Sequence, residues 1–194
     1  MKFWQKSIEQ SRVPTGRLGR IMLLVMGKVY QSMTAWGLSK IDTCEKVLDV
    51  GCGAGGAIYQ MAKSNKFKSI YGIDISQESI NLAQTKNQDF VKKDIVKIIE
   101  ASVLDMPFEN NYFDAVTTFQ SHYHWSDVLA AMKEIHRVLK PNGCFVLVAE
   151  IYKIEYHMKK YDSVTKTRDL LIDSGFCKIN TLKNANSICV IGYK

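Results

Sequence analysis

Glycine and acidic side chains gather in one short stretch, Asp49 to Gly56, which reads Asp-Val-Gly-Cys-Gly-Ala-Gly-Gly. Glycines lack a Cβ and let a ligand approach the backbone, and the start of a following helix offers free N–H groups. The stretch therefore predicts a site for a nucleotide-type cofactor. Gly51, Gly53 and Gly56 also fit the dinucleotide fingerprint G-x-G-x-x-G, so the glycines alone do not identify the cofactor.

Two carboxylates near the glycines narrow the choice of cofactor. Asp49 stands two positions before Gly51, where it suits a cofactor with a cationic amino-acid end and would repel a pyrophosphate. Asp74 lies 19 residues after Gly55, the position from which a carboxylate accepts hydrogen bonds from ribose hydroxyls. A nicotinamide-dependent oxidoreductase shares the glycines and Asp74, and Asp49 is the residue that argues against it.

A second reactive stretch, residues 119–125, reads Phe-Gln-Ser-His-Tyr-His-Trp. Its aromatic rings could form a stacking wall for a planar acceptor, and its imidazoles could take a proton from one that must lose it. We predict His122 as the candidate base, with Tyr123 and His124 as alternatives. The His-x-His pair also resembles half of a metal site, but no carboxylate or cysteine accompanies it at ligand spacing, so no metal is predicted.

Strand and helix signals alternate along the chain and must position these residues. The predicted strands are Lys46 to Val50, Ser69 to Ile73, Val96 to Ala101, Ala115 to Phe119, Cys144 to Ala149, Phe176 to Thr181 and Ser187 to Tyr193. The predicted helices are a stretch ending at Ser64, Ser76 to about Lys92 with Ser76 as its cap, Ser126 to Leu139 ended by Pro141 and Gly143, and a helix whose last part, Asp169 to Ser174, ends at Gly175.

This order predicts an α/β fold: a Rossmann-like, doubly wound, seven-stranded sheet with helices on both faces. It is mostly parallel, with a C-terminal antiparallel hairpin that turns at Asn184-Ala185-Asn186. Before the first strand, Leu18, Met22, Val25, Val29 and Met33 recur at helical spacing, and Gly37 supplies a stop. We predict one domain over 1–194, with 1–40 as a helical lid element within it.

Four segments together resemble class I S-adenosylmethionine (SAM)-dependent methyltransferases. Val47 to Gly55 is similar to the first motif of that family, and Asp74 to its second. Leu104-Asp105-Met106-Pro107-Phe108 followed by Tyr112 to Val116 is similar to the approach to strand four, and Arg137 to Gly143 to the turn before strand five. The resemblance covers nearly the whole chain. It is greatest to small-molecule methyltransferases of ubiquinone and menaquinone biosynthesis.

The resemblance implies SAM as the methyl donor and S-adenosylhomocysteine (SAH) as the product. The backbone of Gly51 and Gly53 would hold the amino-acid portion, Asp49 would organise the loop and the ammonium end, and Asp74 would hold the ribose. Many relatives bind the adenine amino group with an acidic residue after strand three. Here Ser102 stands in its place, with Val103 beside it, so modest SAM affinity is expected. The implied cofactor set is Asp49, Gly51, Cys52, Gly53, Gly55, Asp74, Ile75, Ser102, Val103 and Gln120.

The formal charge of +7 is spread unevenly, with net +7 over residues 1–70, −4 over 71–150 and +4 over 151–194. The positive excess thus falls on the N-terminal elements and the tail. The basic N-terminal helix and Glu150 to Tyr161 are predicted lids over the acceptor, which the charge suggests is anionic or, from the loop, aromatic. No aromatic-interleaved basic stripe favours nucleic acid.

Composition bounds the remaining possibilities. The five cysteines are scattered and form no Cys-x-x-Cys pair, which favours reduced thiols in a cytoplasmic protein. No segment of the sequence is predicted to span a membrane. Two alternatives stay open beside a small-molecule methyltransferase: an RNA-directed methyltransferase that uses the basic ends, and a non-catalytic SAM-binding protein. Either a monomer or a homodimer fits.

Overall fold

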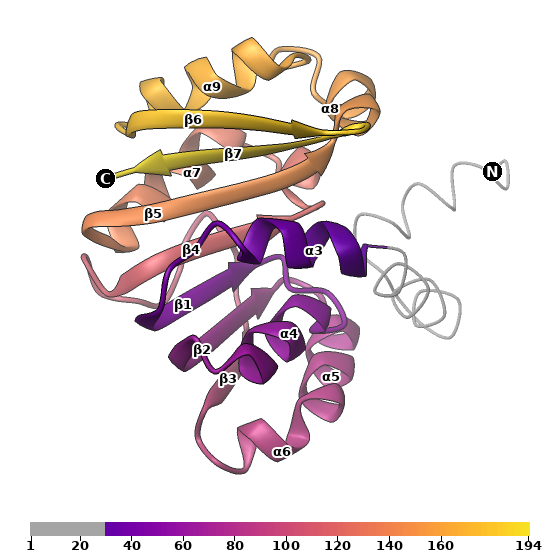
Figure 1. The fold of residues 1–194 in the computed structure, drawn as a ribbon, viewed down its shortest axis with the longest axis vertical. Helices are drawn as coiled ribbons and strands as arrows, with labels where there is room; N and C mark the ends of the chain where they lie inside the picture. Colours follow the sequence, from indigo (N-terminus) through magenta and orange to yellow (C-terminus); the bar gives the residue numbers. More distant parts are fainter. Residues whose placement is uncertain (1–29) are drawn as a thin grey trace, which may run out of the picture.

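A seven-stranded sheet forms the centre of the molecule in a computed structural model, which describes residues 30–194 (Figure 1). The strands lie in the order β3-β2-β1-β4-β5-β7-β6. Their bounds are β1 Cys44–Val50, β2 Phe67–Asp74, β3 Val96–Glu100, β4 Phe113–Phe119, β5 Leu139–Glu150, β6 Cys177–Asn184 and β7 Ser187–Tyr193. Strands β1 to β5 pair in parallel, and β7 pairs antiparallel with both β5 and β6. The predicted fold class and its terminal hairpin are confirmed.

Helices cover both faces of the sheet. They are α3 Gln31–Leu38, α4 Gly56–Ser64, α5 Gln77–Lys86, α6 Gln88–Val91, the short 3₁₀ helix η1 His122–His124, α7 Val128–Val138, α8 Ile151–His157 and α9 Val164–Asp173. In β1 the side chain of Val47 packs with Ile58 and Met61 of α4, whereas Leu48 packs in the core that holds Met132 of α7 and Leu171 of α9. Successive strand residues point to opposite faces, so one buried apolar run serves two cores.

The order of the strands creates the place for a site. From β1 the chain runs to β2 and β3 on one side, then crosses to β4 and β5 on the other. The loops after β1 and β4 therefore diverge at the carboxyl ends of the strands and leave a crevice between them. Both reactive stretches of the sequence follow these two strands.

Two of the predicted helices have different boundaries in the structure. The predicted helix from Ser76 is capped as expected, since Ser76 Oγ accepts a hydrogen bond from Ser79 N, but it is interrupted at Asn87. Helix α7 is capped by Asp127, whose Oδ1 accepts from Ala130 N, and it ends at Val138 because β5 begins at once. The proline and glycine that were predicted to end it lie inside β5.

The N-terminal prediction falls largely outside the described residues, which begin at residue 30. Within them, Gly37 lies in the last turn of α3 rather than after it. A Cβ on Gly37 would come within 2.7 Å of Val148 and Phe119 side-chain atoms. This glycine therefore lets α3 pack closely on β4 and β5. No helix among residues 30–194 is long and apolar enough to cross a membrane.

The interruption at Asn87 ties two elements together. Its side chain is fully buried, and Nδ2 donates to Gly55 O at 3.1 Å and to Ala83 O at 2.8 Å. We expect Asn87→Ala to lower the free energy of unfolding by about 2 kcal/mol, because two buried side-chain hydrogen bonds, each worth about 1 kcal/mol, are lost. Urea denaturation measures this. The control is Asn81→Ala at an exposed position of α5, where a change of less than about 0.5 kcal/mol is expected. Equal effects of the two substitutions would contradict a special role for Asn87.

Candidate active site

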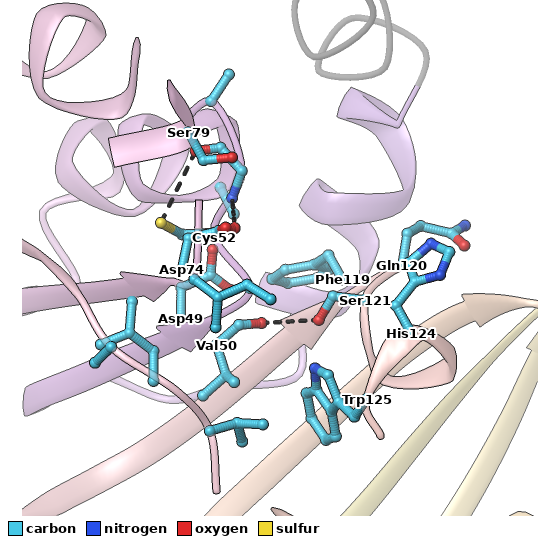
Figure 2. A pocket seen from close by; sticks show the side chains of 18 of the residues that line it. Asp49, Val50, Cys52, Asp74, Ser79, Phe119, Gln120, Ser121, His124 and Trp125 are labelled. Carbon is cyan, nitrogen blue, oxygen red and sulfur yellow. Dashed lines mark hydrogen bonds between the residues drawn. The ribbon is translucent and has the colours of Figure 1, made fainter. Parts of the chain in front are cut away.

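A cavity opens at the carboxyl ends of the central strands, between the glycine loop and the loop that follows β4 (Figure 2). Its walls come from the loops after β1, β2, β3 and β4 and from the start of α3. All ten residues of the predicted cofactor set except Gly55 line it. The topology thus brings together residues that lie up to 71 positions apart, from Asp49 to Gln120.

The glycine loop owes its shape to left-handed backbone. Gly51, Gly53 and Gly55 have φ values of 71°, 52° and 71°, which residues with a Cβ adopt at a cost. The N–H groups of Gly51 and Cys52 both donate to Ile73 O, at 2.9 and 3.0 Å, so the loop is fastened to the end of β2. Gly55 is the N-cap residue of α4 and does not line the cavity. The loop is therefore held in one conformation.

Asp49 is a buried carboxyl group on the cavity wall. It is only 2% exposed, and Thr117 Oγ1 in β4 donates to its Oδ1 at 2.8 Å. Burial raises the pKa of Asp49 to about 7, and the neighbouring charge of Asp74 adds to the rise, while the Thr117 hydrogen bond opposes it. A cation bound in the cavity would favour the ionised form.

Asp74 connects the glycine loop to the end of β2. Its Oδ2 accepts from Gly53 N and its Oδ1 from Ser76 N, both at 2.9 Å. Burial raises the pKa of Asp74, against these backbone hydrogen bonds. Each oxygen has a second lone pair, so the carboxylate can orient the loop and still accept from a ligand hydroxyl. Here the contact that organises the loop comes from Asp74, which accepts from Gly53 N, whereas the carboxyl group of Asp49 accepts from Thr117 in β4.

The end of the cavity beside β3 is less polar. Ser102, Val103 and Ile75 line it, with Val103 buried and Ile75 exposed. Ser102 Oγ already accepts a hydrogen bond from Leu104 N at 3.1 Å, which closes a local turn. The hydroxyl keeps one lone pair and its O–H for a ligand, but it carries no charge. The Cys52 thiol on the same wall is buried, and burial raises its pKa, so it stays a protonated thiol.

The three candidate acid–base residues do not share one environment. His124 lines the cavity, and Figure 2 places it with Trp125 across the cavity from Asp74. His122 does not line it; burial lowers the pKa of this fully buried imidazole to about 3. Tyr123 also lies outside it and donates to Gln120 Oε1 at 2.9 Å, and burial raises its pKa, so its hydroxyl stays protonated.

Gln120 makes several of the hydrogen bonds that hold the loop after β4. Its φ of 58° is unusual for a residue with a side chain. Its amide accepts from Tyr123 and donates to Met33 Sδ of α3, and its N–H donates to Val148 O. Such a strained, fully engaged residue at the end of β4 is typical of a site that depends on fixed geometry.

Sequence reasoning missed several members of the site. Thr117 holds Asp49, Ser121 Oγ donates to Val50 O at 3.0 Å, and Tyr30 lines the cavity beside α3. Two adjacent hydroxyl side chains in the buried part of a central strand were the available signal for Thr117 and Thr118. Among residues 30–194, no group of three or more His, Cys, Asp or Glu side chains is arranged to hold a metal ion.

Comparison with known proteins decides the family. A family model described as a methyltransferase domain matches residues 48–147, which is more than half of the chain. This chain belongs to the class I SAM-dependent methyltransferase family. The matched region runs from β1 into β5 and therefore contains the glycine loop, both aspartates and the loop after β4.

Relatives of this methyltransferase act on different molecules. A cycloartenol-C-24-methyltransferase of Oryza sativa is 38% identical over 53% of this chain and 29% of its own length. A 2-phytyl-1,4-naphtoquinone methyltransferase of Trichormus variabilis is 35% identical over 53% of this chain and 44% of its own length. The chain thus spans less than half the length of these two curated relatives. A SAM-dependent methyltransferase structure from Methanococcus maripaludis has a TM-score of 0.73 at 19% identity, over 93% of this chain and 95% of the other, and shares the fold.

Proposed function

We propose that this methyltransferase binds SAM in the cavity at the carboxyl ends of β1 and β4 and transfers its methyl group to a small-molecule acceptor. One observation carries the proposal: a buried carboxyl group and a left-handed glycine loop face the same cavity, whose opposite wall is aromatic. The sterol and naphthoquinone relatives named above support an organic molecule as the acceptor. These relatives are whole proteins that are longer than the region matched here.

The residues fit SAM by charge and by shape. When bound, the sulfonium group supplies an electrophilic methyl carbon, and the electron pair of the broken C–S bond stays on sulfur. Asp49 would face the α-ammonium group, and Asp74 would accept from the ribose hydroxyls. Gly51 and Gly53, which both line the cavity with positive φ, would contact the amino-acid portion. Ser102 and Val103 would border the adenine. Because neither side chain is acidic, the amino group of the adenine would have no charged partner, and the affinity for SAM would be modest.

The acceptor would enter from the side of His124 and Trp125. Methyl transfer requires that nucleophile, carbon and sulfur align in a site that excludes water. Trp125 offers an apolar face for a planar acceptor, and His124 is the candidate base on the cavity wall. We propose further that residues 1–40 form a lid within a single domain.

The proposed role of His124 has a direct test. With a phenolic acceptor, His124→Phe should lower kcat about hundredfold, because proton removal no longer has a positioned base, and should leave SAH affinity unchanged. Labelled methyl transfer and calorimetry measure the two quantities. His136→Gln is the matched control, since this imidazole packs against Phe176 outside the cavity. Unchanged kcat in His124→Phe would exclude the base, and SAH binding without transfer to any acceptor would favour a non-catalytic protein.

A further inference from the structure

A second cavity lies next to the first, on the far side of Trp125 and Ser126. These two residues line both cavities, so the two cavities meet beside them. The walls come from η1, from the start of α7 and from the segment that follows α8. The other lining residues are His122, Tyr123, Val128, His157, Met158, Lys159, Lys160 and Tyr161. The second cavity therefore adjoins the proposed acceptor entrance.

His122 is the unusual member of this wall. Its side chain is 0% exposed, and neither Nδ1 nor Nε2 has a hydrogen-bond partner among the described residues. Burial, with a smaller effect of His124, lowers the pKa of His122 to about 3, so the ring is neutral and offers one N–H donor and one acceptor. A buried polar group without a partner destabilises the fold, and an apolar side chain of similar size would pack here without that cost. The unsatisfied imidazole points to a ligand.

The charge around the cavity indicates which ligand. Lys159 and Lys160 line it, are exposed, and make no ion pair with a carboxylate among residues 30–194. The ring of His157 stacks on Tyr123 at a centroid distance of 5.3 Å and an interplanar angle of 12°. The cavity thus combines a buried neutral N–H donor, an aromatic wall and two cations, but no lining carboxylate. A carboxylate or phosphate group complements the N–H donor and the two cations, and an apolar or aromatic part of the same molecule complements the aromatic wall.

We propose that the second cavity is a subsite for an anionic group of the methyl acceptor. The buried imidazole of His122 donates to a carboxylate or phosphate oxygen, and Lys159 and Lys160 neutralise the charge at the surface. The remainder of the acceptor passes Trp125 and reaches the cofactor cavity. This inference rests on the proposed function, and it narrows the acceptor to molecules that carry an acidic group.

Histidine ring NMR on the full chain tests the subsite. The protein contains four histidines, so the signal of His122 is assigned by its loss in His122→Phe. In protein saturated with SAH, 4-hydroxybenzoate or phenyl phosphate should shift the His122 ring signals saturably. The neutral 4-hydroxybenzamide should not shift them. Equal shifts with the amide, or no saturable shift with either anion, would overturn the proposal. A shift of the His122 signals with inorganic phosphate, but with neither 4-hydroxybenzoate nor phenyl phosphate, would also overturn it. The site would then hold an adventitious ion only and would not recognise an acceptor.

Matched lysine variants test the charge. Lys159→Gln/Lys160→Gln should weaken anion binding about fivefold, the effect of two solvent-exposed charges. Lys92→Gln/Lys93→Gln removes the same charge from exposed positions between α6 and β3 and should leave binding unchanged. His122→Phe should bind the anion about tenfold more weakly while the protein is at least as stable as wild type. If His122→Phe does not fold, the His122 signal is assigned by elimination with His124→Phe, His136→Gln and His157→Gln, and the wild-type spectra and the lysine variants then decide.

The two proposals fail in different ways. Calorimetry with SAH on the same samples reports the cofactor site independently of the second cavity. SAH binding without an anion-dependent shift at His122 would overturn the subsite and leave the proposed function standing. Absence of SAH binding would overturn the proposed function, and with it the assignment of the anion site to a methyl acceptor.

Discussion

Gly51→Ala is expected to weaken SAH binding at least about hundredfold and to lower the free energy of unfolding by about 2 kcal/mol. Gly51 has a φ of 71°, and an added Cβ would lie 2.4 Å from Ser121 Oγ and 2.6 Å from Ser121 Cβ. The Ser121 side chain cannot easily move away, because its Oγ donates a hydrogen bond to Val50 O at 3.0 Å and shares another with Thr118 Oγ1 at 2.7 Å. The glycine loop would have to move. Calorimetry and urea denaturation measure the two effects.

Two companion variants separate the causes. Gly51→Ala/Ser121→Gly removes the overlap but keeps the left-handed strain, so it should recover part of the lost affinity. Gly143→Ala lies in β5, away from the cavity, where its Cβ would meet Lys140 O at 2.9 Å and Asp114 O at 3.0 Å. This variant should lose stability yet bind SAH normally. If Gly51→Ala bound SAH with wild-type affinity, the glycine loop would not be part of the cofactor site.

The fold and the position of the cavity could be predicted because they depend on local signals. A short apolar strand, a glycine turn and a helix form a unit whose parts lie within a few residues, and parallel strands bring the carboxyl ends of such units to one edge. Asp49 and Asp74 each end such a strand or lie near its end, so their place followed from the strand boundaries. The cap at Ser76 was predicted for the same reason.

The choice between His122 and His124 could not be predicted in this way. These residues lie in a 3₁₀ helix, in which successive residues turn by about 120°, so two positions apart they face different directions. The sequence pattern of alternating aromatics does not reveal this turn. Only His124 faces the cofactor cavity, whereas His122 is enclosed by residues from α7 and the segment after α8. Asn87 is a similar case, since its partner Gly55 is 32 positions away.

The buried carboxyl group of Asp49 should make cofactor binding depend on pH. Its pKa of about 7 in the folded protein means that a cationic ligand must first displace a proton below that pH. The SAH dissociation constant should therefore fall about tenfold per unit from roughly pH 5.5 to 7 and then level off. Over this range the α-ammonium group of the ligand stays protonated. Calorimetry across this range measures the slope.

The same group gives the unliganded protein the opposite trend. A carboxyl group whose pKa is raised by folding holds its proton more tightly in the native state than in the unfolded chain. Its contribution to stability is therefore fully present below about pH 4 and is lost as the pH rises to about 7. Since Asp74 shifts in the same direction, its contribution has the same sign. SAH should thus raise the free energy of unfolding most above about pH 7, where the unliganded protein has lost the contribution of protonated Asp49.

Asp49→Asn separates these effects. The amide keeps the size of the side chain and removes the charge, so the variant should be more stable than wild type at pH 8. It should bind SAH about hundredfold more weakly there and lose most of the pH dependence of binding. Asp114→Asn is the control: its carboxylate pairs with Lys140 at 2.6 Å at the amino end of β4, where its loss should leave SAH binding unchanged. If Asp49→Asn retained both the affinity and the slope, the ammonium group would lie elsewhere, and Asp49 would not be its partner.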